Sequence, residues 1–413
     1  MKIAIINATC GFGSTGKIAV ALYDMFQKYG HSAKVFYGIE RVVTQENAVN
    51  NPDFFFFGNK NILKVDRVFG AILGRSGELS FIPTKKLLRG LTDFKPDIVW
   101  LLNIHGSFVH EFMLLNYLKD NKIWTYYSMI DEYAYLGKCC NEIDCDKYKY
   151  ERGCYECTHL KNSPRSIFFD NSHRKFIKKK KVYEGFDQLI FGSVPFVVDK
   201  ARHSFLLKDR EVWTADEAVD MTKVYYPRST ERLREELKIG DKRVVLLCAS
   251  ITSPVKGTHF FLEAAQKLLD EDIVFLNVSF GGDESLCPEN YIPLPYETDI
   301  NHMAEYYSLA DAYVCTSISD TQPNACLEAM GCGTPIIGFN ISGVPYIAPN
   351  EFGTFVDEIS ADALASAIKN VKKKTPEFSK KVREYAVSRF SNEAAEKRNI
   401  EFLAEIQRRK GKC

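Results

Sequence analysis

The sequence of 413 residues lacks the marks of several protein classes. It contains no run of 18 or more apolar residues, so we expect no membrane-spanning helix. The formal net charge is only +1, and nothing in the overall charge favours a nucleic-acid partner. Residues Met1–Ala8 are too short and wrongly flanked for a signal peptide and should form a first β-strand. Internal repeats are absent, and we expect a cytoplasmic globular protein of two or three domains.

Short apolar runs alternate along the chain with amphipathic stretches of helical period, which predicts an α/β protein. The candidate strands are Ile3–Ala8, Ala33–Tyr37, Ile98–Leu102, Ile123–Met129, Leu189–Phe191, Val244–Ala249, Ile273–Val278, Ala312–Cys315 and Thr334–Gly338. The candidate helices are Gly16–Tyr29, His259–Leu269, Met303–Leu309, Pro323–Met330 and Ala361–Val371. We expect two doubly wound parallel sheets that bind ligands at the carboxyl ends of their strands, with a junction near residues 212–240.

The stretch from Asp320 to Pro335, D-T-Q-P-N-A-C-L-E-A-M-G-C-G-T-P, carries the strongest functional pattern. Asp320 stands just before a predicted helix whose first position suits Pro323, and Glu328 stands more than one turn inside that helix. A helix N-terminus offers free backbone N–H groups and a partial positive charge, which together make an anion site. Two carboxylates beside such an end suit a sugar and a ribose, with a phosphate near the helix.

This stretch resembles the E-x7-E signature of family 4 retaining glycosyltransferases, with Asp320 in place of the first glutamate. In that family the first acid contacts the donor sugar and the second contacts the nucleotide ribose. The resemblance therefore assigns these contacts to Asp320 and Glu328. It also assigns donor binding to the residues at the helix start, which are Pro323, Asn324 and Ala325.

The resemblance runs through most of the chain and implies the GT-B fold, with two Rossmann-like domains facing across a cleft. Residues 1–211 would form an acceptor-binding domain that carries a cysteine-rich insertion at 139–157. Residues 212–386 would bind the nucleotide-sugar, and a helix at 387–413 would return to the first domain. The resembling branch contains bacterial capsule, exopolysaccharide and O-antigen enzymes.

A glycine-rich loop, Gly11-Phe12-Gly13-Ser14-Thr15-Gly16-Lys17, follows the first strand and opens the first helix. Small residues there allow the backbone to approach a ligand closely. The loop departs from a Walker A motif, because Ile18 stands where a magnesium-binding Ser or Thr is required. A dinucleotide-binding fingerprint and a purely structural turn are two alternatives that fit the sequence. The family has a similar loop beside the donor phosphates, which assigns donor binding to Gly13, Ser14 and Gly16.

Lys256 and Gly257 follow a predicted strand, at a place where the family carries R-x5-K-G. The two cations of that motif neutralise the leaving nucleoside diphosphate, and Lys256 fits the lysine. Ser250 replaces the arginine, and a serine can donate a hydrogen bond but brings no charge. The alternative for Lys256 is a solvated lysine before a helix.

Two first-half strands are followed by His105 and Asp131, in segments that resemble H-N-I-H-G and T-L-H-D-M-W-A-F-T-G-x-C of the family. The family's active-site histidine falls on Ile130, unless an insertion shifts Tyr127 to that place. His105 could substitute for the missing histidine, and we predict catalytic roles for His105 and Asp131. A structural histidine is the alternative.

Twelve cysteines without a secretion signal favour reduced thiols or a metal over disulfides. Cys140, Cys145, Cys154 and Cys157 have spacings that could bind a structural Zn²⁺, with free thiols and disulfides as alternatives. The basic run from His173 to Lys181 is either a solvated helix face or a contact with acidic lipid headgroups. Enzymes of the resembling class often use lipid-linked acceptors, which suggests a peripheral membrane location.

The sequence thus predicts a retaining transferase that moves a sugar from a nucleotide-sugar to the hydroxyl of a saccharide or lipid-linked saccharide. Lys256 and the helix N-terminus near Asn324 would stabilise the leaving diphosphate, so we expect no metal cofactor to be required. One alternative is a catalytically degenerate binding partner, which Ser250 and Ile130 favour. A less favoured alternative is a nucleotide-sugar 2-epimerase, which would need further acid and base groups.

Overall fold

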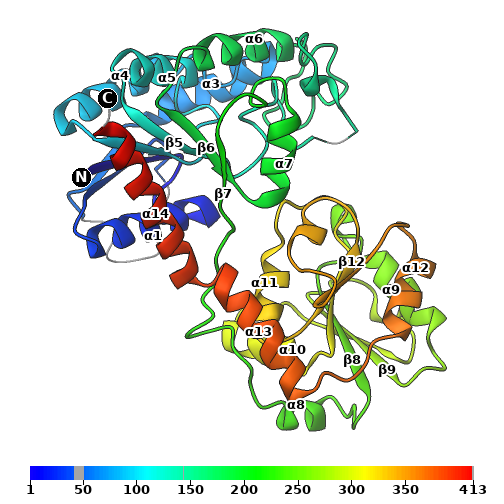
Figure 1. Ribbon diagram of the computed structural model, residues 1–413. Helices are drawn as coiled ribbons and strands as arrows, with labels where there is room; N and C mark the ends of the chain where they lie inside the picture. Colours follow the sequence, from blue (N-terminus) through cyan, green and yellow to red (C-terminus); the bar gives the residue numbers. More distant parts are fainter. Residues whose placement is uncertain (41–50, 143, 412–413) are drawn as a thin grey trace. The chain divides into compact units, whose positions relative to one another are not determined.

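A computed structural model describes residues 1–40, 51–142 and 144–411 and separates them into two compact units (Figure 1). The first unit contains Met1–Ser193, Val197–Thr214 and the residues from Ala404 onward. The second contains Val194–Phe196 and Ala215–Leu403. The chain therefore passes from the first unit to the second after Thr214 and returns at Ala404.

The first unit is built on a seven-stranded sheet with the order β3-β2-β1-β4-β5-β6-β7, and every neighbouring pair is parallel. Its strands are β1 Lys2–Asn7, β2 Ser32–Tyr37, β3 Phe54–Phe56, β4 Ile98–Leu101, β5 Trp124–Ser128, β6 Leu189–Ser193 and β7 Val212–Thr214. The order reverses direction between β1 and β4, which is the place where doubly wound sheets bind ligands. The loops after β1, β4 and β5 all leave the sheet at this edge.

The second unit is built on a six-stranded parallel sheet with the order β10-β9-β8-β11-β12-β13. Its strands are β8 Arg243–Cys248, β9 Ile273–Val278, β10 Tyr291–Leu294, β11 Ala312–Cys315, β12 Ile336–Phe339 and β13 Gly353–Val356. Here the order reverses between β8 and β11. Lys256 follows β8 and Asp320 follows β11, so both candidate residues leave the sheet at the reversal.

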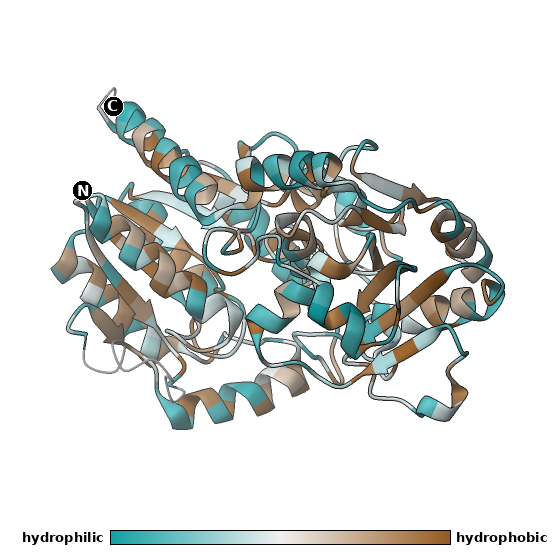
Figure 2. Ribbon diagram, turned by 90° about the horizontal axis from the view of Figure 1, so that it is seen from below, coloured by the Kyte–Doolittle hydropathy of each residue, from teal (hydrophilic) through white to brown (hydrophobic). Residues whose placement is uncertain are grey.

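Helices cover both sheets. Figure 2 shows the reason: the strands carry mostly apolar residues, whereas the outer helices have apolar and polar residues in alternation. The helices of the first unit are α1 Gly13–Lys28, α3 Lys60–Leu73, α4 Phe81–Phe94, α5 Glu111–Asp120, α6 Ser172–Tyr183 and most of α7 Pro195–His203. Those of the second are α8 Glu231–Glu236, α9 Thr258–Lys267, α10 Ile300–Leu309, α11 Asn324–Gly331, α12 Ala361–Lys369 and α13 Pro376–Phe390. The last helix, α14 Asn392–Lys410, begins in the second unit and ends in the first.

Alternate strand residues of the second unit enter two separate cores, one on each face of its sheet. Val245, Phe275 and Val314 pack with α9 and α12, whereas Val244 and Leu276 pack with α10, α11 and α13. Figure 1 shows these two groups of helices on opposite faces of the sheet. The second core fixes α11, and with it Glu328, against the strands.

The structure contains strands and helices that the sequence-based prediction omitted. The strands β3, β7, β10 and β13, of three or four residues each, were absent from the prediction, and so were the helices α3, α4, α5, α7, α8 and α13. Because β7 lies in the first unit, that unit extends to Thr214 and does not end at residue 211. The predicted C-terminal helix ends at residue 413, which lies outside the described residues.

Among the described helices, none combines the length and the apolar character that a membrane span requires.

Candidate functional site

Lys256 and Asp320 form an ion pair at the strand reversal of the second unit. Lys256 ends the short 3-10 helix Pro254–Lys256, and its Nζ lies 2.9 Å from Oδ2 of Asp320. Burial opposes the charge on Lys256, but the hydrogen bond and the charge of Asp320 prevail and raise the pKa of this lysine. Lys256 is therefore a cation beside a carboxylate, and its contact with a diphosphate stays a prediction.

Two glycines allow the loops around this ion pair to pack closely. Gly257 has a φ of 63°, and a Cβ there would lie 2.3 Å from the carbonyl oxygen of Thr316. Gly343 donates its N–H to the carbonyl oxygen of Asp320 at 2.8 Å. A Cβ on Gly343 would lie 1.7 Å from the carbonyl oxygen of Thr321, a distance that no side chain could accept. These contacts fix the backbone that carries Lys256 and Asp320.

Glu328 lies on α11, one helical turn and more beyond the helix start, and is mostly buried. The hydroxyl of Tyr307 donates to its Oε2 at 2.7 Å, and Tyr225 supplies a second hydrogen bond. Burial raises the pKa of Glu328, although the two tyrosines oppose this shift. The two tyrosines hold the carboxyl group in one orientation, and this arrangement could not be seen in the sequence.

The start of α11 presents backbone N–H groups as expected, but Pro323 precedes the helix and does not occupy its first position. Pro323 is the N-cap residue with extended geometry, and the helix begins at Asn324, which is exposed. Within the described residues, no side chain accepts a capping hydrogen bond here. Ala325 is half-buried in the first turn. The helix start thus keeps donors that an anion could accept.

Ser250 does not offer its hydroxyl freely to a ligand. Its Oγ lies 2.8 Å from Oγ1 of Thr252 and donates to the carbonyl oxygen of Phe280 at 3.3 Å. The serine therefore closes its own loop against the segment that follows β9. It brings no charge, and Lys256 has no second cation at this position.

Glu217 is a further acidic residue of this site, and sequence reasoning did not single it out as a ligand contact. Its backbone N–H donates to Oε1 of Gln322 at 2.7 Å, and Gln322 also donates to Asp216 at 2.8 Å. Burial raises the pKa of Glu217 to about 7, and the negative charge of Asp320 adds to this shift. Its place in the site depends on a contact with Gln322, 105 positions away, which no local pattern marks.

The glycine-rich loop of the first unit is held by buried polar contacts behind it. Asn7, at the end of β1, donates to the carbonyl oxygen of Thr9 at 2.8 Å and accepts from the N–H of Asn103 at 3.2 Å. The helix α1 begins at Gly13, with a φ of 69°, and not at Gly16 as predicted. A Cβ on Gly16 would lie 2.7 Å from Oγ1 of Thr9, so this position excludes larger residues.

Ser14 is exposed in the first turn of α1, and a Cβ on Gly13 would have no atom within 4 Å. Space for a ligand therefore remains beside Gly13 and Ser14, which the sequence assigned to donor binding. The structure places these two residues in the first unit, whereas Lys256, Asp320 and Glu328 belong to the second.

His105 and Asp131, predicted as catalytic, contact each other within the first unit. Nε2 of His105 lies 2.7 Å from Oδ2 of Asp131, and the ring packs beside Tyr133 with centroids 4.9 Å apart. Burial would lower the pKa of His105, but hydrogen bonds and negative charge from Asp131 and Cys140 raise it to about 10. His105 is therefore an imidazolium at neutral pH and a hydrogen-bond donor, not a proton-accepting base.

Ile130 is half-buried and directly precedes Asp131. Tyr127, the alternative position for the family histidine, lies in β5 and is buried against Phe191 with ring centroids 5.7 Å apart. A side chain in that core cannot take the place of a site histidine. The replacement of the missing histidine by His105, which follows the neighbouring strand, stays a prediction.

The predicted zinc ligand Cys140 does not lie with the other three predicted ligands. Its Sγ lies 3.7 Å and 3.8 Å from the two ring nitrogens of His105. Because these distances are nearly equal, the sulfur is aligned with neither nitrogen lone pair. The group of His105, Asp131 and Cys140 has its ligand atoms within 4.8 Å of one another, but its geometry suits an ion pair with a thiol neighbour better than a metal.

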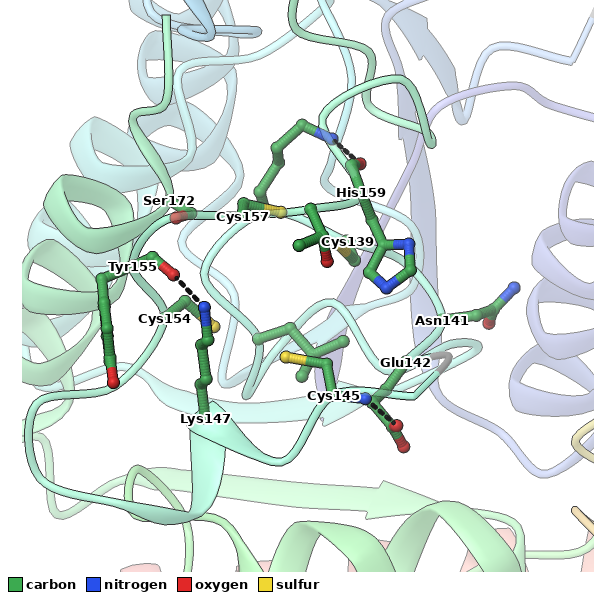
Figure 3. Close-up of a pocket in the computed structure, with 13 residues that line it drawn as sticks. Cys139, Asn141, Glu142, Cys145, Lys147, Cys154, Tyr155, Cys157, His159 and Ser172 are labelled. Carbon is green, nitrogen blue, oxygen red and sulfur yellow. Dashed lines mark hydrogen bonds between the residues drawn. The ribbon is translucent and has the colours of Figure 1, made fainter.

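The thiols around the small cavity differ from the predicted zinc set in one member: Cys139 lines the cavity together with Cys145, Cys154 and Cys157, and Cys140 does not (Figure 3). Binding of zinc stays a prediction. Cys139 and Cys140 are adjacent in an irregular loop, so spacing alone could not decide between them. Residue 143 of the predicted insertion lies outside the described part of the chain.

The basic run His173–Lys181 forms most of α6, and several of its cations have structural partners. Lys175 and Lys179 are buried, and Lys179 donates to the carbonyl oxygens of Tyr133 and Leu136. Arg174 and Lys178 both bind Glu78. His173 and Lys181 are exposed. Most of the run thus supports the fold, and contact with lipid headgroups stays a prediction.

Known proteins resemble this chain most clearly in the second unit. The family described as Glycosyl transferases group 1 matches residues 242–373, which contain Lys256, Asp320 and Glu328. A UDP-Gal:alpha-D-GlcNAc-diphosphoundecaprenol alpha-1,3-galactosyltransferase of Escherichia coli is 30% identical over 135 residues, covering 29% of this chain and 34% of the relative. A D-inositol 3-phosphate glycosyltransferase of Corynebacterium efficiens is 26% identical over 162 residues, covering 34% and 38%. The chain thus aligns with less than half the length of these two relatives.

Similarity to solved structures extends over both units. The Anabaena protein Alr3699/HepE in complex with UDP-glucose has a TM-score of 0.60 at 13% identity, with 98% of this chain and 100% of that chain covered. A glycosyltransferase from Rickettsia africae has a TM-score of 0.63 at 14% identity, with 98% of each chain covered. Two Rossmann-like units with parallel sheets, together with this likeness over nearly the whole chain, show that the protein has the GT-B fold.

Proposed function

We propose that this protein is a glycosyltransferase that moves a sugar from a nucleotide-sugar to an acceptor hydroxyl with retention of anomeric configuration. The observation that carries the proposal is the Lys256–Asp320 ion pair beside the start of α11, with Glu328 fixed by tyrosines on the same helix. The match of this region to Glycosyl transferases group 1 supports it. So does the binding of UDP-glucose by the structurally similar HepE.

The donor-side chemistry follows from charge. When the bond between the anomeric carbon and the diphosphate breaks, negative charge develops on the phosphate oxygens. Lys256 and the free N–H groups near Asn324 stabilise that charge before the reaction begins, which lowers the barrier without reorganisation. Asp320 accepts hydrogen bonds from sugar hydroxyls, and Glu328 accepts them from the ribose. These groups supply the charge for which other enzymes use a metal, and so we propose that no metal is required.

Retention is assigned to front-face displacement. The acceptor oxygen bonds to the anomeric carbon on the side from which the diphosphate leaves, and the acceptor proton passes to a leaving phosphate oxygen. Asp320 is paired with Lys256 and is unsuited to act as a nucleophile. His105, charged and held by Asp131, donates a hydrogen bond to a sugar or acceptor oxygen and takes no proton.

The acceptor is assigned to the saccharides of bacterial surface polysaccharides, lipid-linked ones included. The E. coli relative is named for a diphosphoundecaprenol acceptor, which supports this class. Peripheral contact with the membrane through His173 and Lys181 of α6 belongs to the same proposal. It would bring the enzyme to an acceptor that diffuses in the membrane.

A catalytically degenerate binding partner is the second candidate, because Ser250 removes one diphosphate cation and Ile130 removes the family histidine. A 2-epimerase lacks support, since the second unit supplies no additional acid and base pair beyond Glu217 and Asp320 among the described contacts.

One assay distinguishes these functions. Purified protein is incubated with UDP-, GDP- and TDP-sugars, with and without saccharide acceptors, and products are followed by mass spectrometry and by the anomeric coupling in NMR. We expect transfer with retained configuration that disappears in Lys256→Met. Binding of donor without transfer or hydrolysis would favour the binding partner, and a changed sugar without an acceptor would favour the epimerase.

A further inference from the structure

Four cysteine side chains line one small cavity in the segment between β5 and α6 (Figure 3). The cavity has a volume of about 30 Å³, which is enough to admit a water molecule. The thiol cluster, as we name these residues, consists of Cys139, Cys145, Cys154 and Cys157. All four are half-buried free cysteines.

The sulfur atoms are directed toward the cavity. Figure 3 shows the four side chains around its rim, and the thiol of Cys139 hydrogen-bonds to the sulfur of Cys157. Four thiols around one cavity have the ligand number and type of structural zinc sites. Their sulfur atoms would have to draw together to bind one ion, because the only described set of three or more ligand atoms within 4.8 Å of one another is that of His105, Asp131 and Cys140. Their spacing, C-x5-C-x8-C-x2-C, ends in the two-residue gap common to zinc knuckles.

Backbone donors are already arranged for thiolate ligands. The N–H of Gly137 donates to Sγ of Cys154 at 3.1 Å, and the N–H of His159 donates to the sulfur of Cys157. Hydrogen bonds of this kind orient metal ligands and favour their charged form. The ammonium of buried Lys138, held by the carbonyl oxygens of His159 and Asn162 at 3.2 Å and 2.7 Å, provides positive charge nearby.

The turn between the last two cysteines is fixed in a conformation that brings them together. Glu156 has a φ of 43°, which is unfavourable for residues other than glycine. Lys147 holds this turn by donating to the carbonyl oxygens of Tyr155 and Glu156 at 2.8 Å and 2.9 Å.

The segment that carries the four cysteines has little regular structure. In the described residues from Met129 to Asn171, the one regular element is the 3-10 turn Lys147–Lys149. Ordering such a segment costs conformational entropy. A metal bound by four of its residues would add to the stabilisation that its buried side chains provide.

We propose that the thiol cluster binds one Zn²⁺ through four thiolates in tetrahedral geometry, releasing its thiol protons to solvent on binding. The site is structural, because four protein ligands leave no open position for a substrate. Cys140 is not a ligand, since its sulfur lies beside His105. Its backbone nonetheless joins the two regions: the carbonyl oxygen of Cys140 accepts from the N–H of Glu132 at 2.8 Å.

The test measures metal in the full-length protein purified under reducing conditions with zinc in the growth medium. We expect one zinc per chain by elemental analysis, and a Co²⁺-substituted protein with the visible absorption of tetrahedral cobalt thiolate. Cys139→Ser should lose most of the zinc. The adjacent Cys140→Ser and the remote Cys287→Ser are matched controls that should retain it, and so should His159→Ala.

The proposal would be overturned if wild-type protein contained no zinc or did not show the cobalt spectrum. It would also be overturned if Cys140→Ser lost zinc while Cys139→Ser kept it, or if His159→Ala lost zinc. Disulfides among the four cysteines, detected by thiol titration, would overturn it as well. Should Cys139→Ser fail to fold, titration of wild-type protein with a mercurial reagent decides. Release of one zinc as four thiolates react supports the site, and release after fewer or none contradicts it.

Discussion

Replacement of Asp320 by asparagine should separate diphosphate binding from sugar transfer. In the free protein Lys256 is bound to Asp320 at 2.9 Å, and the same ammonium must face the diphosphate when donor is bound. Asp320 therefore competes with the phosphate oxygens for this cation. Asparagine keeps the shape of the side chain but removes the competing charge, so the variant should bind a nucleoside diphosphate more tightly.

The expected magnitude follows from the exposure of the ion pair. Two unit charges 2.9 Å apart attract by about 6 kcal/mol at an effective dielectric constant near 20. The side chains are 43% and 22% exposed, however, and solvated pairs contribute only about 1 kcal/mol net. Releasing Lys256 from Asp320 should therefore lower the Kd of UDP by about fivefold. Transfer should fall nevertheless, because the amide no longer offers a carboxylate to the sugar hydroxyls.

Calorimetry with UDP and with uridine measures the effect, and a glycosyl-transfer assay with the donor that the wild type uses measures turnover. Lys256→Met is the matched control: it should weaken UDP binding and leave uridine binding unchanged. The double variant tests coupling, since without the lysine the Asp320→Asn change should no longer improve binding. Weaker UDP binding by Asp320→Asn, together with unchanged transfer, would refute the assignment of both residues.

Three further predictions concern other residues of the site. Glu328→Gln should weaken donor binding by about 1.5–3 kcal/mol, which is the contribution of a hydrogen bond to a charged group. The melting temperature checks that the variant is folded, and an unchanged donor affinity would contradict the prediction. The pKa of Glu217 is raised from 4.5 to about 7 in the folded protein, so the folded protein keeps a proton that the unfolded protein releases near pH 4.5. This group therefore stabilises the fold at low pH, and the stabilisation is lost as pH rises through about 7. Glu217→Gln should therefore gain at most about 3 kcal/mol relative to wild type above that pH in urea unfolding, and a pH-independent difference would contradict the shift. The side chain of Ile130 cannot hydrogen-bond a C6 hydroxyl, and burial of that hydroxyl without a partner costs about 1–3 kcal/mol. We therefore expect the protein to prefer 6-deoxyhexose donors over plain hexoses, and we expect Ile130→His to reverse this preference. Better turnover of the plain hexose by the wild type would refute the prediction.

The sequence predicted those parts of the site that depend on local pattern. Lys256 and Asp320 each follow a buried strand, and Glu328 lies on the helix that comes after Asp320. Parallel strands bring such positions to one edge of a sheet. Contacts across the chain were invisible: Tyr307 on Glu328 and Gln322 on Glu217 join residues 21 and 105 positions apart. No spacing rule encodes such pairs.

The irregular segment before α6 was the least predictable part. Periodicity does not exist there, so nothing in the sequence decided whether Cys139 or Cys140 faces the cavity. The lysines of α6 were misjudged for a related reason. A run of cations suggests a solvated face, yet burial with carbonyl partners makes Lys175 and Lys179 internal supports.

The missing side chain of Gly343 has a consequence for how this protein tolerates change. Because the carbonyl oxygen of Thr321 occupies the place where a Cβ would stand, even a methyl group there must displace the backbone that carries Asp320. A neutral, non-polar residue that touches no ligand thus controls the position of a charge. Activity could be lost by adding one carbon atom at position 343 while every charged and hydrogen-bonding side chain of the site remains in the sequence.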